Sequence, residues 1–302
     1  MARLVIGTDK TATTPAFIRE IGEYVGGGLT IDYSKDVNDN LISYPGMVAT
    51  CGIKGIKAQN LLQNKFTNST TVTTVDFDSV EVIDGFFVCN ATFSSCTNLT
   101  SLSMANLTTI SGTDACRSMF DGSGLTGSVS LPNLTTISGA NAVRSMFGNC
   151  ANVTSVSLPN LTSVVDGDSA CRYMFGGMSN LTSVNLPSLS TVSAPNGLHT
   201  LFGENTSLTT VSFPSLDNIP ASTCFYTMFN RCTSLTSVSF PALKSTSFGS
   251  YTNQFNKMLN NCSNVAVHFP SNLQAVIGSW SDVTAGFNGS NTTVLYDLPA
   301  TE

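Results

Sequence analysis

The side chains in this chain that most often act in catalysis or metal binding are those of its nine cysteines and two histidines. Cysteines bind metals in C-x-x-C pairs and form disulfide frameworks in even numbers. The sequence has no such pair, and its total is odd. Instead, eight cysteines recur at fixed offsets from a repeated anchor position: Cys96, Cys150, Cys232 and Cys262 three residues after it, Cys89, Cys116 and Cys171 four before it, and Cys224 five before it. We therefore predict buried, reduced thiols that pack as small apolar groups, with disulfides or a metal site as the alternative.

A column of basic side chains has the same period. Arg117, Arg144 and Arg172 each lie three residues before the anchor, and His199 and Tyr226 continue the line. Because stacked like charges repel each other, nearby acids should offset them. We expect the arginines to cap coil carbonyls and to pair with loop acids, with a ligand-facing cation stripe as the alternative; the candidate acids are Asp114, Asp121, Asp166 and Asp168.

The carboxylates do not form a recognisable catalytic or metal site. Glycoside hydrolysis needs two carboxylates that converge within about 5–10 Å, whereas the acids here are scattered over connectors. Asp32, Asp36 and Asp39 form a small cluster without the glycine and final glutamate of a calcium loop. No nucleophile elbow, P-loop or dinucleotide fingerprint occurs in a suitable context. The prediction is a protein that is not an enzyme and has no cofactor and no metal.

The composition excludes further classes. Only 11% of residues are charged, against roughly 25% in ordinary soluble domains. A net charge of −6 argues against binding to nucleic acid, which needs clustered cations. No stretch approaches the roughly 20 apolar residues of a membrane span.

Phenylalanines mark an internal repeat that positions all of these side chains. The anchors follow one another at steps of 27, 27, 27, 28, 27 and 27 residues: Phe66, Phe93, Phe120, Phe147, Phe175, Phe202 and Phe229; Leu259 is an eighth anchor. Within one copy, Val184 and Leu186 should point inward and Asn185 outward, as in a β-strand, and Pro187 should end that strand. The apolar residues that follow at three-residue intervals suggest a 3₁₀-like or irregular return limb. Stacked copies would bury a continuous core, with equivalent strands about 4.8 Å apart.

The repeat has the pattern F-x-x-C-x-x-L-T-S-V-x-L-P-x-L-T-x-I, which resembles the leucine-rich repeats of BspA-type bacterial surface antigens over about residues 66–277. This resemblance implies a parallel-strand solenoid used for adhesion and for protein or glycan contact, without catalytic residues. We expect a leucine-rich-repeat-like solenoid with one short parallel β-strand per ~27-residue coil, about eight coils in all. A small α/β segment should precede it.

The outward side of the strands is the candidate contact surface. Its predicted partner-binding residues are Ser130, Ser157, Asn185, Ser212 and Ser239, and the alternative is a plain solvated surface. The face has almost no aromatic groups, which binding hot spots favour. Asn-Leu-Thr triplets at Asn98, Asn106, Asn133, Asn160 and Asn180 match the glycosylation pattern, but we interpret them as repeat positions.

The two ends of the chain differ from the repeats. Residues 1–65 hold seven of the thirteen cations, which suggests a boundary near residue 60. Residues 3–6 should form a strand and residues 14–25 a helix that ends at the glycine triplet 26–28. We expect residues 1–60 to be an attachment or oligomerisation segment, residues 61–277 the solenoid and residues 278–302 a C-terminal cap built on large apolar side chains: Trp280, Phe287, Val294, Leu295 and Tyr296.

The first ten residues do not resemble a signal peptide, because their apolar run is only three residues long. An adhesion solenoid without an export signal could leave the cell inside a phage particle. We therefore predict a virion fibre or spike, homotrimeric, that contacts other virion proteins through residues 1–60. Its target would be a host surface protein or glycan, and no nucleic acid or membrane would be bound. The alternative is a bacterial cell-surface adhesin.

Overall fold

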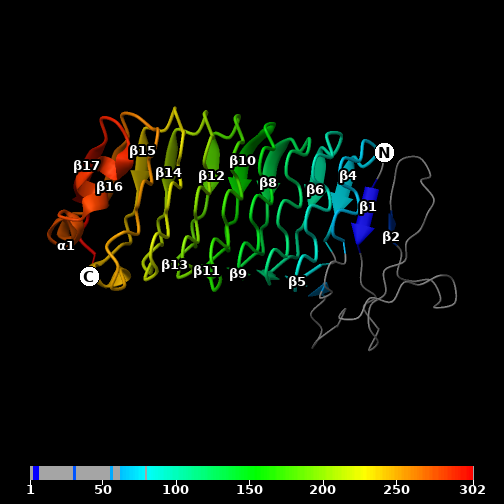
Figure 1. Cartoon of the computed structure of the whole chain (residues 1–302), viewed down its shortest axis with the longest axis horizontal. Coiled ribbons are helices and arrows are strands. Elements are labelled where there is room, and N and C mark those ends of the chain that lie inside the picture. Colours follow the sequence, from blue (N-terminus) through cyan, green and yellow to red (C-terminus); the bar gives the residue numbers. More distant parts are fainter. Residues whose placement is uncertain (1–2, 7–29, 32–54, 57–61, 79, 302) are drawn as a thin grey trace.

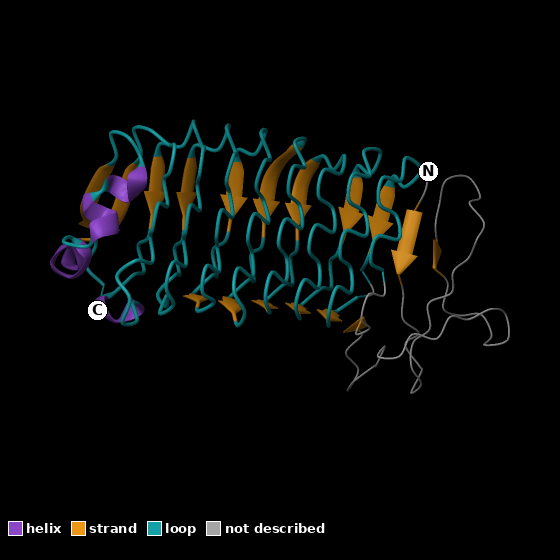
Figure 2. Ribbon diagram, viewed as in Figure 1, coloured by secondary structure: helices purple, strands orange, loops and turns teal. Residues whose placement is uncertain are grey.

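The chain forms a stack of coils in a computed structural model, which describes residues 3–6, 30–31, 55–56, 62–78 and 80–301. Figure 1 shows the coils arranged along one axis, with β1 near one end and β17 at the other. Each coil has a short parallel strand in one wall, the coils from β3 to β13 have a second one in another wall, and loops and tight turns join them (Figure 2). This architecture confirms the predicted leucine-rich-repeat-like solenoid.

The first wall, here called the strand wall, contains the Val-centred strands. Its three sheet segments have the orders β2-β1-β4-β6, β12-β10-β8 and β14-β15-β16-β17, all parallel. The strand bounds are β1 Arg3–Ile6, β2 Thr30–Ile31, β4 Thr74–Asp76, β6 Ser101–Ser103, β8 Gly127–Ser130, β10 Val153–Ser157, β12 Ser183–Asn185, β14 Thr210–Ser212, β15 Ser237–Ser239, β16 Ala266–Pro270 and β17 Thr293–Leu298. In β4, β8 and β14 the valines Val75, Val129 and Val211 face the core, and the residues that flank them face outward, as the alternation predicts.

The return limb forms a second parallel sheet with the order β13-β11-β9-β7-β5-β3. Its strands are β3 Gly55–Ile56, β5 Val82–Asp84, β7 Thr109–Ser111, β9 Thr136–Ser138, β11 Ser163–Val165 and β13 Thr191–Val192. The expected 3₁₀-like or irregular limb is therefore wrong for these coils. Each coil satisfies its neighbour's backbone polar groups through this ladder. Side chains such as Ile110 and Ile137 are register partners and are fully buried.

The third wall, here called the turn wall, carries the anchors. Alternate N–H groups donate to the next coil, as Phe120 N does to the Met146 carbonyl at 2.8 Å. The N–H groups between them close tight turns, as Met119 N does onto the Cys116 carbonyl at 3.2 Å. Every fourth residue has a left-handed backbone, for example Asn141, Ser145 and Asn149 with φ of 51–57°. Asparagine and serine suit these positions better than β-branched residues do.

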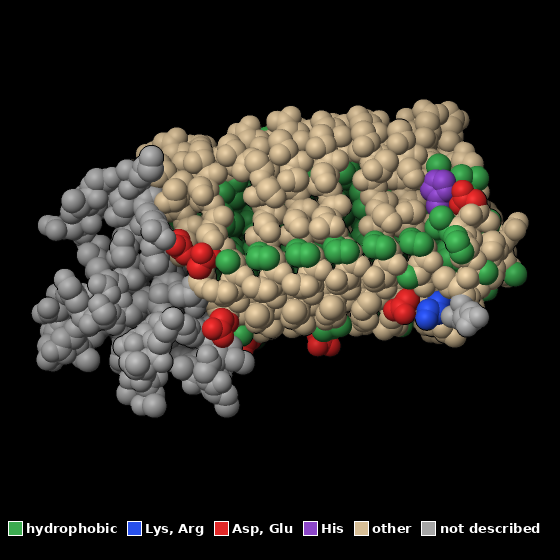
Figure 3. All heavy atoms as spheres, turned by 180° about the vertical axis from the view of Figure 1, so that it is seen from behind, with side chains coloured by type: hydrophobic (Ala, Val, Ile, Leu, Met, Phe, Trp, Pro, Cys, Tyr) green, Lys and Arg blue, Asp and Glu red, His purple; other side chains and the backbone are tan. Residues whose placement is uncertain are grey.

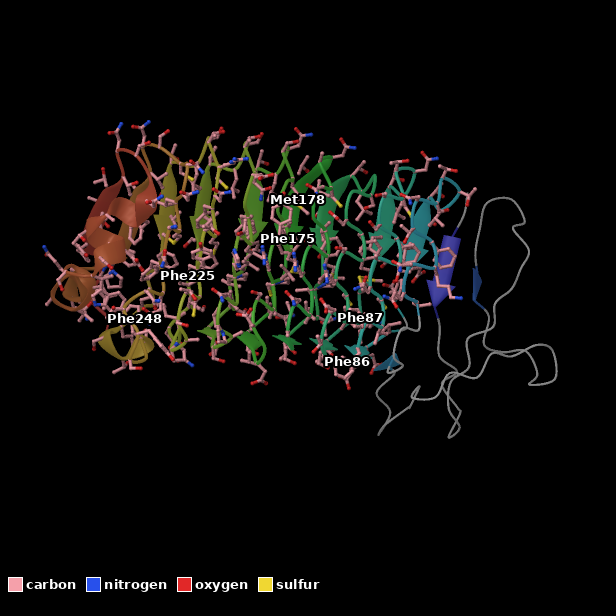
Figure 4. The ribbon with its side chains drawn as sticks, in the orientation of Figure 1. Phe86, Phe87, Phe175, Met178, Phe225 and Phe248 are labelled. Carbon is pink, nitrogen blue, oxygen red and sulfur yellow. The ribbon has the colours of Figure 1, made fainter. Side chains whose placement is uncertain are left out.

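The phenylalanine anchors form one continuous ring stack inside the turn wall. Ring centroids of successive anchors from Phe66 to Phe229 lie 5.3–6.1 Å apart, with interplanar angles of 2–15°. Phe66 is partly buried, whereas the others have almost no exposed surface. Figure 4 shows Phe175 with Met178 among the coils at mid-stack. Stacked aromatic pairs add about 0.5–1.5 kcal/mol beyond burial, so the ladder stabilises neighbouring coils against each other.

The C-terminal segment contains helical turns and a further coil. Its elements are η1 Ser245–Ser247, η2 Ser271–Leu273, α1 Gln274–Ile277, α2 Ser281–Thr284 and η3 Gly286–Asn288. Leu259 N donates to the Phe287 carbonyl at 3.0 Å, as Phe229 N does to the Met258 carbonyl, so Phe287 lies in the turn wall of a further coil, at the position that Met258 has in its own coil. Strand β17 then pairs with β16. The expected cap therefore also extends the strand wall, because the coil period continues past residue 277.

The N-terminal strand predicted at residues 3–6 is β1, and it pairs in parallel with β4. Strand β3 likewise pairs with β5. The described strands of the first 60 residues therefore continue the two sheets of the solenoid. The helix expected at 14–25 and the glycine triplet lie outside the described residues. The division at residue 60 and the attachment role remain predictions.

Candidate functional site

The predicted contact residues lie in one line on the outside of the strand wall. Ser130, Ser157 and Asn185 are register partners across β8, β10 and β12. Ser212 and Ser239 are partners across β14 and β15. Ser130, Asn185 and Ser212 are exposed, and the other two are half-buried. A second outward column runs parallel to the first and is also mostly hydroxyl-bearing: Ser101, Ser128, Ser155, Ser183, Thr210 and Ser237.

Neighbouring side chains on this face bind one another. The Ser239 hydroxyl lies 2.8 Å from the Ser212 oxygen, and Asn185 Nδ2 donates to Ser157 Oγ at 3.3 Å. In the view from behind, backbone and side chains that are neither charged nor hydrophobic make up most of the described surface, crossed by a row of hydrophobic side chains along the stack (Figure 3). From β6 to β15 the outward strand positions carry no charge. Such a surface can exchange hydrogen bonds with a partner, but it holds no nucleophile activated by a neighbouring base.

The cysteine columns are buried as predicted, but they are not only apolar filler. Cys150 Sγ lies 3.2 Å from the Phe120 carbonyl, and Cys232 Sγ lies 2.9 Å from the Phe202 carbonyl. Where the column lacks cysteine, Asn205 Nδ2 makes the equivalent bond to the Phe175 carbonyl at 2.9 Å. In the column that lies three residues after the anchor, the thiols therefore donate to the carbonyls of the preceding anchors. The periodicity of the sequence predicts that these cysteines are buried. Their role as hydrogen-bond donors could not be predicted, because it depends on where the anchor carbonyls lie.

All eight described cysteines are free and buried. Burial raises the pKa of the Cys150 thiol to about 11 and that of Cys224 to about 12. Burial also raises the thiol pKa of Cys171 and Cys232 well above the ordinary value. A thiol that stays protonated is a poor nucleophile and a poor metal ligand, so these columns are structural.

The basic column is in register through its backbone. Ser118 N donates to the Arg144 carbonyl at 2.7 Å, and Ser145 N donates to the Arg172 carbonyl at 2.8 Å. Arg117 pairs with Asp114 at 3.6 Å, as expected. The other expected pairs do not form: Asp121 Oδ1 accepts from Asn149, and Asp168 Oδ1 accepts from Asn196.

Arg144 and Arg172 make no ion pair within the described part of the chain. Burial lowers the pKa of Arg144, and the charges of Arg172 and Arg117 lower it further. Next in the column, burial and Arg172 lower the pKa of His199 to about 4, so this imidazole is neutral at pH 7. The Tyr226 ring meets the His199 ring edge-on at 4.8 Å. Asp114 and Asp168 offset only part of this positive charge, since the arginines of the column still lower the pKa values of Arg144 and His199.

The Asn-Leu-Thr triplets have structural roles. Nδ2 of four of the five asparagines donates to a carbonyl of the preceding coil at 2.6–2.8 Å: Asn98 to Thr70, Asn106 to Asp78, Asn133 to Ala105 and Asn160 to Pro132. These bonds support the interpretation of the triplets as repeat positions.

No group of three or more metal-ligating side chains occurs among the described residues. The aspartate cluster at 32, 36 and 39 lies outside them. Within the same part of the chain, no helix is long and apolar enough to cross a membrane.

The comparisons with known proteins decide the family. The model of the BspA type leucine rich repeat region matches residues 53–142 and 141–280, in six copies. The chain belongs to the BspA-type leucine-rich repeat family. The residues matched include every phenylalanine anchor from Phe66 to Phe229, so the BspA-type repeat and the ring stack coincide.

Solved structures similar to this BspA-type chain include two leucine-rich repeat proteins. The T. pallidum leucine rich repeat protein is 20% identical, with a TM-score of 0.32, over 57% of this chain and 78% of its own. A leucine rich cell surface protein from Faecalibacterium prausnitzii is 15% identical, with a TM-score of 0.29, over 76% and 75%. No curated protein sequence matches the chain significantly.

Proposed function

We propose that this chain is a non-enzymatic adhesion protein of the bacterial cell surface that contacts its partner through the strand wall. The observation that carries the proposal is the flat, uncharged, hydroxyl-rich face from β6 to β15, in a chain of the BspA-type family. The absence of a charged cluster on that face also fits a role other than catalysis.

The regular face favours many weak contacts over one strong contact. Ser130, Ser157 and Asn185 repeat the same small polar group at strand spacing, about 4.8 Å. Each such hydrogen bond contributes little in water, about 0.5–1.5 kcal/mol. Repetition along the sheet, and many copies on one cell, would supply avidity instead.

Variants of the strand wall test the contact surface. Beads coated with the full chain should adhere to cultured cell layers, and Ser157→Arg with Ser212→Arg should reduce adhesion at least tenfold by placing charge on the face. Thr191→Arg on the second sheet is the matched control and should adhere normally. Equal adhesion by all three proteins would contradict a role for the strand wall.

The location needs a separate experiment, because the virion fibre remains the competing prediction. Antibodies against the chain should label intact producing cells and leave purified phage particles unlabelled. Family membership supports the cell surface, whereas labelled particles would restore the virion interpretation.

The predicted homotrimer is independent of location. Light scattering on the intact chain measures it directly: a mass near three times 31.8 kDa would support the trimer. A monomer would remove oligomerisation from the roles proposed for residues 1–60.

A further inference from the structure

A shallow groove runs along the corner between the strand wall and the second sheet, where three successive coils carry an Asn-Leu-Thr triplet. It encloses about 540 Å³, within the 300–1,000 Å³ typical of small-ligand sites. Three asparagines and three threonines from successive coils line it: Asn106, Asn133, Asn160, Thr108, Thr135 and Thr162. We call it the Asn–Thr groove.

The hydrogen bonds to the backbone fix what these side chains offer to a ligand. Asn133 uses one Nδ2 proton on the Ala105 carbonyl, at 2.7 Å. Its Oδ1 and its second amide proton remain for other partners, and its side chain is exposed. Asn106 and Asn160 are held in the same way on their own coils.

The threonines contribute only acceptors. Thr135 Oγ1 donates its proton to the Thr108 carbonyl at 3.0 Å, and Thr162 Oγ1 donates to the Thr135 carbonyl at 3.1 Å. Thr108 makes the same bond to the Glu81 carbonyl at 2.8 Å. The hydroxyl lone pairs are what each threonine can still offer. Every coil of the groove therefore presents two acceptor groups and one donor at a fixed spacing.

A sugar hydroxyl is the ligand group that matches this set, because it donates and accepts at the same time. The groove has one carboxylate, Glu81 at its N-terminal end, and no lysine or arginine among its lining residues. Strongly anionic ligands would therefore lack a counter-charge. A chain of neutral sugars needs none.

A peptide is a poorer match. Peptides that bind to β-structures usually pair their main chain with free backbone groups. Here the Thr108 carbonyl already accepts from Thr135 N at 2.8 Å as well as from Thr135 Oγ1, and the Thr135 carbonyl accepts from Thr162 N at 2.9 Å. The Thr108 and Thr135 carbonyls are therefore already occupied by the neighbouring coil.

We infer that the Asn–Thr groove binds a linear neutral glycan lying along the solenoid axis, with successive sugar units over successive coils. The equivalent side chains repeat every coil, about 4.8 Å apart, which is close to the advance of one sugar in an extended glycan. The site is separate from the strand-wall contact proposed above and does not depend on it.

The chain itself provides a substitution that separates ligand binding from coil structure. At the asparagine position of the next two coils, Ser188 Oγ donates to the Pro159 carbonyl and Ser215 Oγ to the Pro187 carbonyl, both at 2.6 Å. Serine therefore keeps the backbone bond. It loses the amide oxygen and the free amide proton.

The experiment is calorimetric titration of the full chain with neutral hexasaccharides: cellohexaose, mannohexaose and the hexamer of N-acetylglucosamine. At least one should bind saturably. Asn133→Ser with Asn160→Ser should weaken that binding at least tenfold without changing the melting temperature. Ser188→Asn, which adds one more amide to the groove, should strengthen it.

A matched control and two contrary outcomes complete the test. Ser157→Arg on the strand wall should bind the hexasaccharide as the unaltered chain does, which separates this site from the adhesion face. Failure of all three neutral hexasaccharides at millimolar concentration would overturn the inference. Binding that is unaffected by the two serine substitutions, or that occurs only with polygalacturonate, would also overturn it.

Discussion

The Sγ atom of Cys150 lies 3.2 Å from the carbonyl oxygen of Phe120, the anchor of the preceding coil. The same relation joins Cys262 to Phe229 at 2.9 Å. Each thiol is thus held in the core by a donor bond as well as by packing. This relation couples the two most regular columns of the repeat, the rings and the sulfurs.

Thiol reactivity follows from that burial. At pH 8 iodoacetamide should leave all eight described cysteines unmodified in the folded protein, because alkylation needs a thiolate and burial raises the pKa of Cys150 to about 11. Mass spectrometry should find them all modified in guanidinium chloride. A Ser130→Cys variant, exposed on the strand wall, should react within minutes and serves as the control. Rapid modification of Cys150 in the native state would contradict the structure.

The ring stack should be sensitive to truncation. Phe147 is fully buried between Phe120 and Phe175, at centroid distances of 5.3 and 5.8 Å. Phe147→Ala should lower the free energy of unfolding by about 3–5 kcal/mol, as measured by urea denaturation. Phe147→Leu should cost clearly less, because leucine occupies the anchor at Leu259. Phe86 is not part of the ring stack: it follows β5 at the edge of the solenoid (Figure 4) and is 56% exposed. Phe86→Ala should therefore change the free energy of unfolding by no more than about 0.5 kcal/mol.

One glycine column fixes the approach of successive coils. Gly139 has φ of 99°, and a Cβ there would lie 2.6 Å from the Gly112 carbonyl oxygen. Gly139→Ala should therefore destabilise the fold by more than about 2 kcal/mol. Gly127 has φ of 72° but open space around its Cβ position. Gly127→Ala should cost only the backbone strain, about 1–2 kcal/mol, and comparison of the two melting temperatures separates strain from collision.

Acid should weaken the fold through His199. Its folded-state pKa of about 4 lies below the ordinary 6.5, because burial and the positive charge of Arg172 disfavour the protonated ring. The stability that the neutral His199 ring contributes is therefore fully present above pH 6.5 and is lost as the pH falls toward 4. After allowance for solvent screening, the loss should be about 1–2 kcal/mol. His199→Gln should flatten the decline in melting temperature over that window, and an unchanged decline would assign it to other groups.

The repeat, its anchors and the inward and outward residues could all be predicted from the sequence, because burial repeats with the coil. Phe120 and Val156 are examples: each is buried at the position its copy predicts. The further coil that contains Phe287 was predicted only as a cap, since that segment lacks the Met-Phe pair of the repeat. The 28-residue step from Leu259 was the available indication.

Features that depend on contacts between coils could not be predicted. The left-handed backbone at Ser145 follows from the ladder with Arg172, and nothing in the local sequence requires it. The partners of the arginines were also only partly foreseen, since Asn149 and Asn196 compete for Asp121 and Asp168. Sequence spacing gives proximity, whereas the choice of partner depends on side-chain direction.

The hydrogen bonds between coils run in both directions. Asn133, Thr135 and Cys150 all donate to carbonyls in the coil that precedes their own, whereas the backbone N–H groups of Ser118 and Phe120 donate to carbonyls of the coil that follows. A coil inside the stack thus supplies acceptors to both of its neighbours. Because such a stack depends on contacts between adjacent coils, folding can start at any coil and propagate toward both ends.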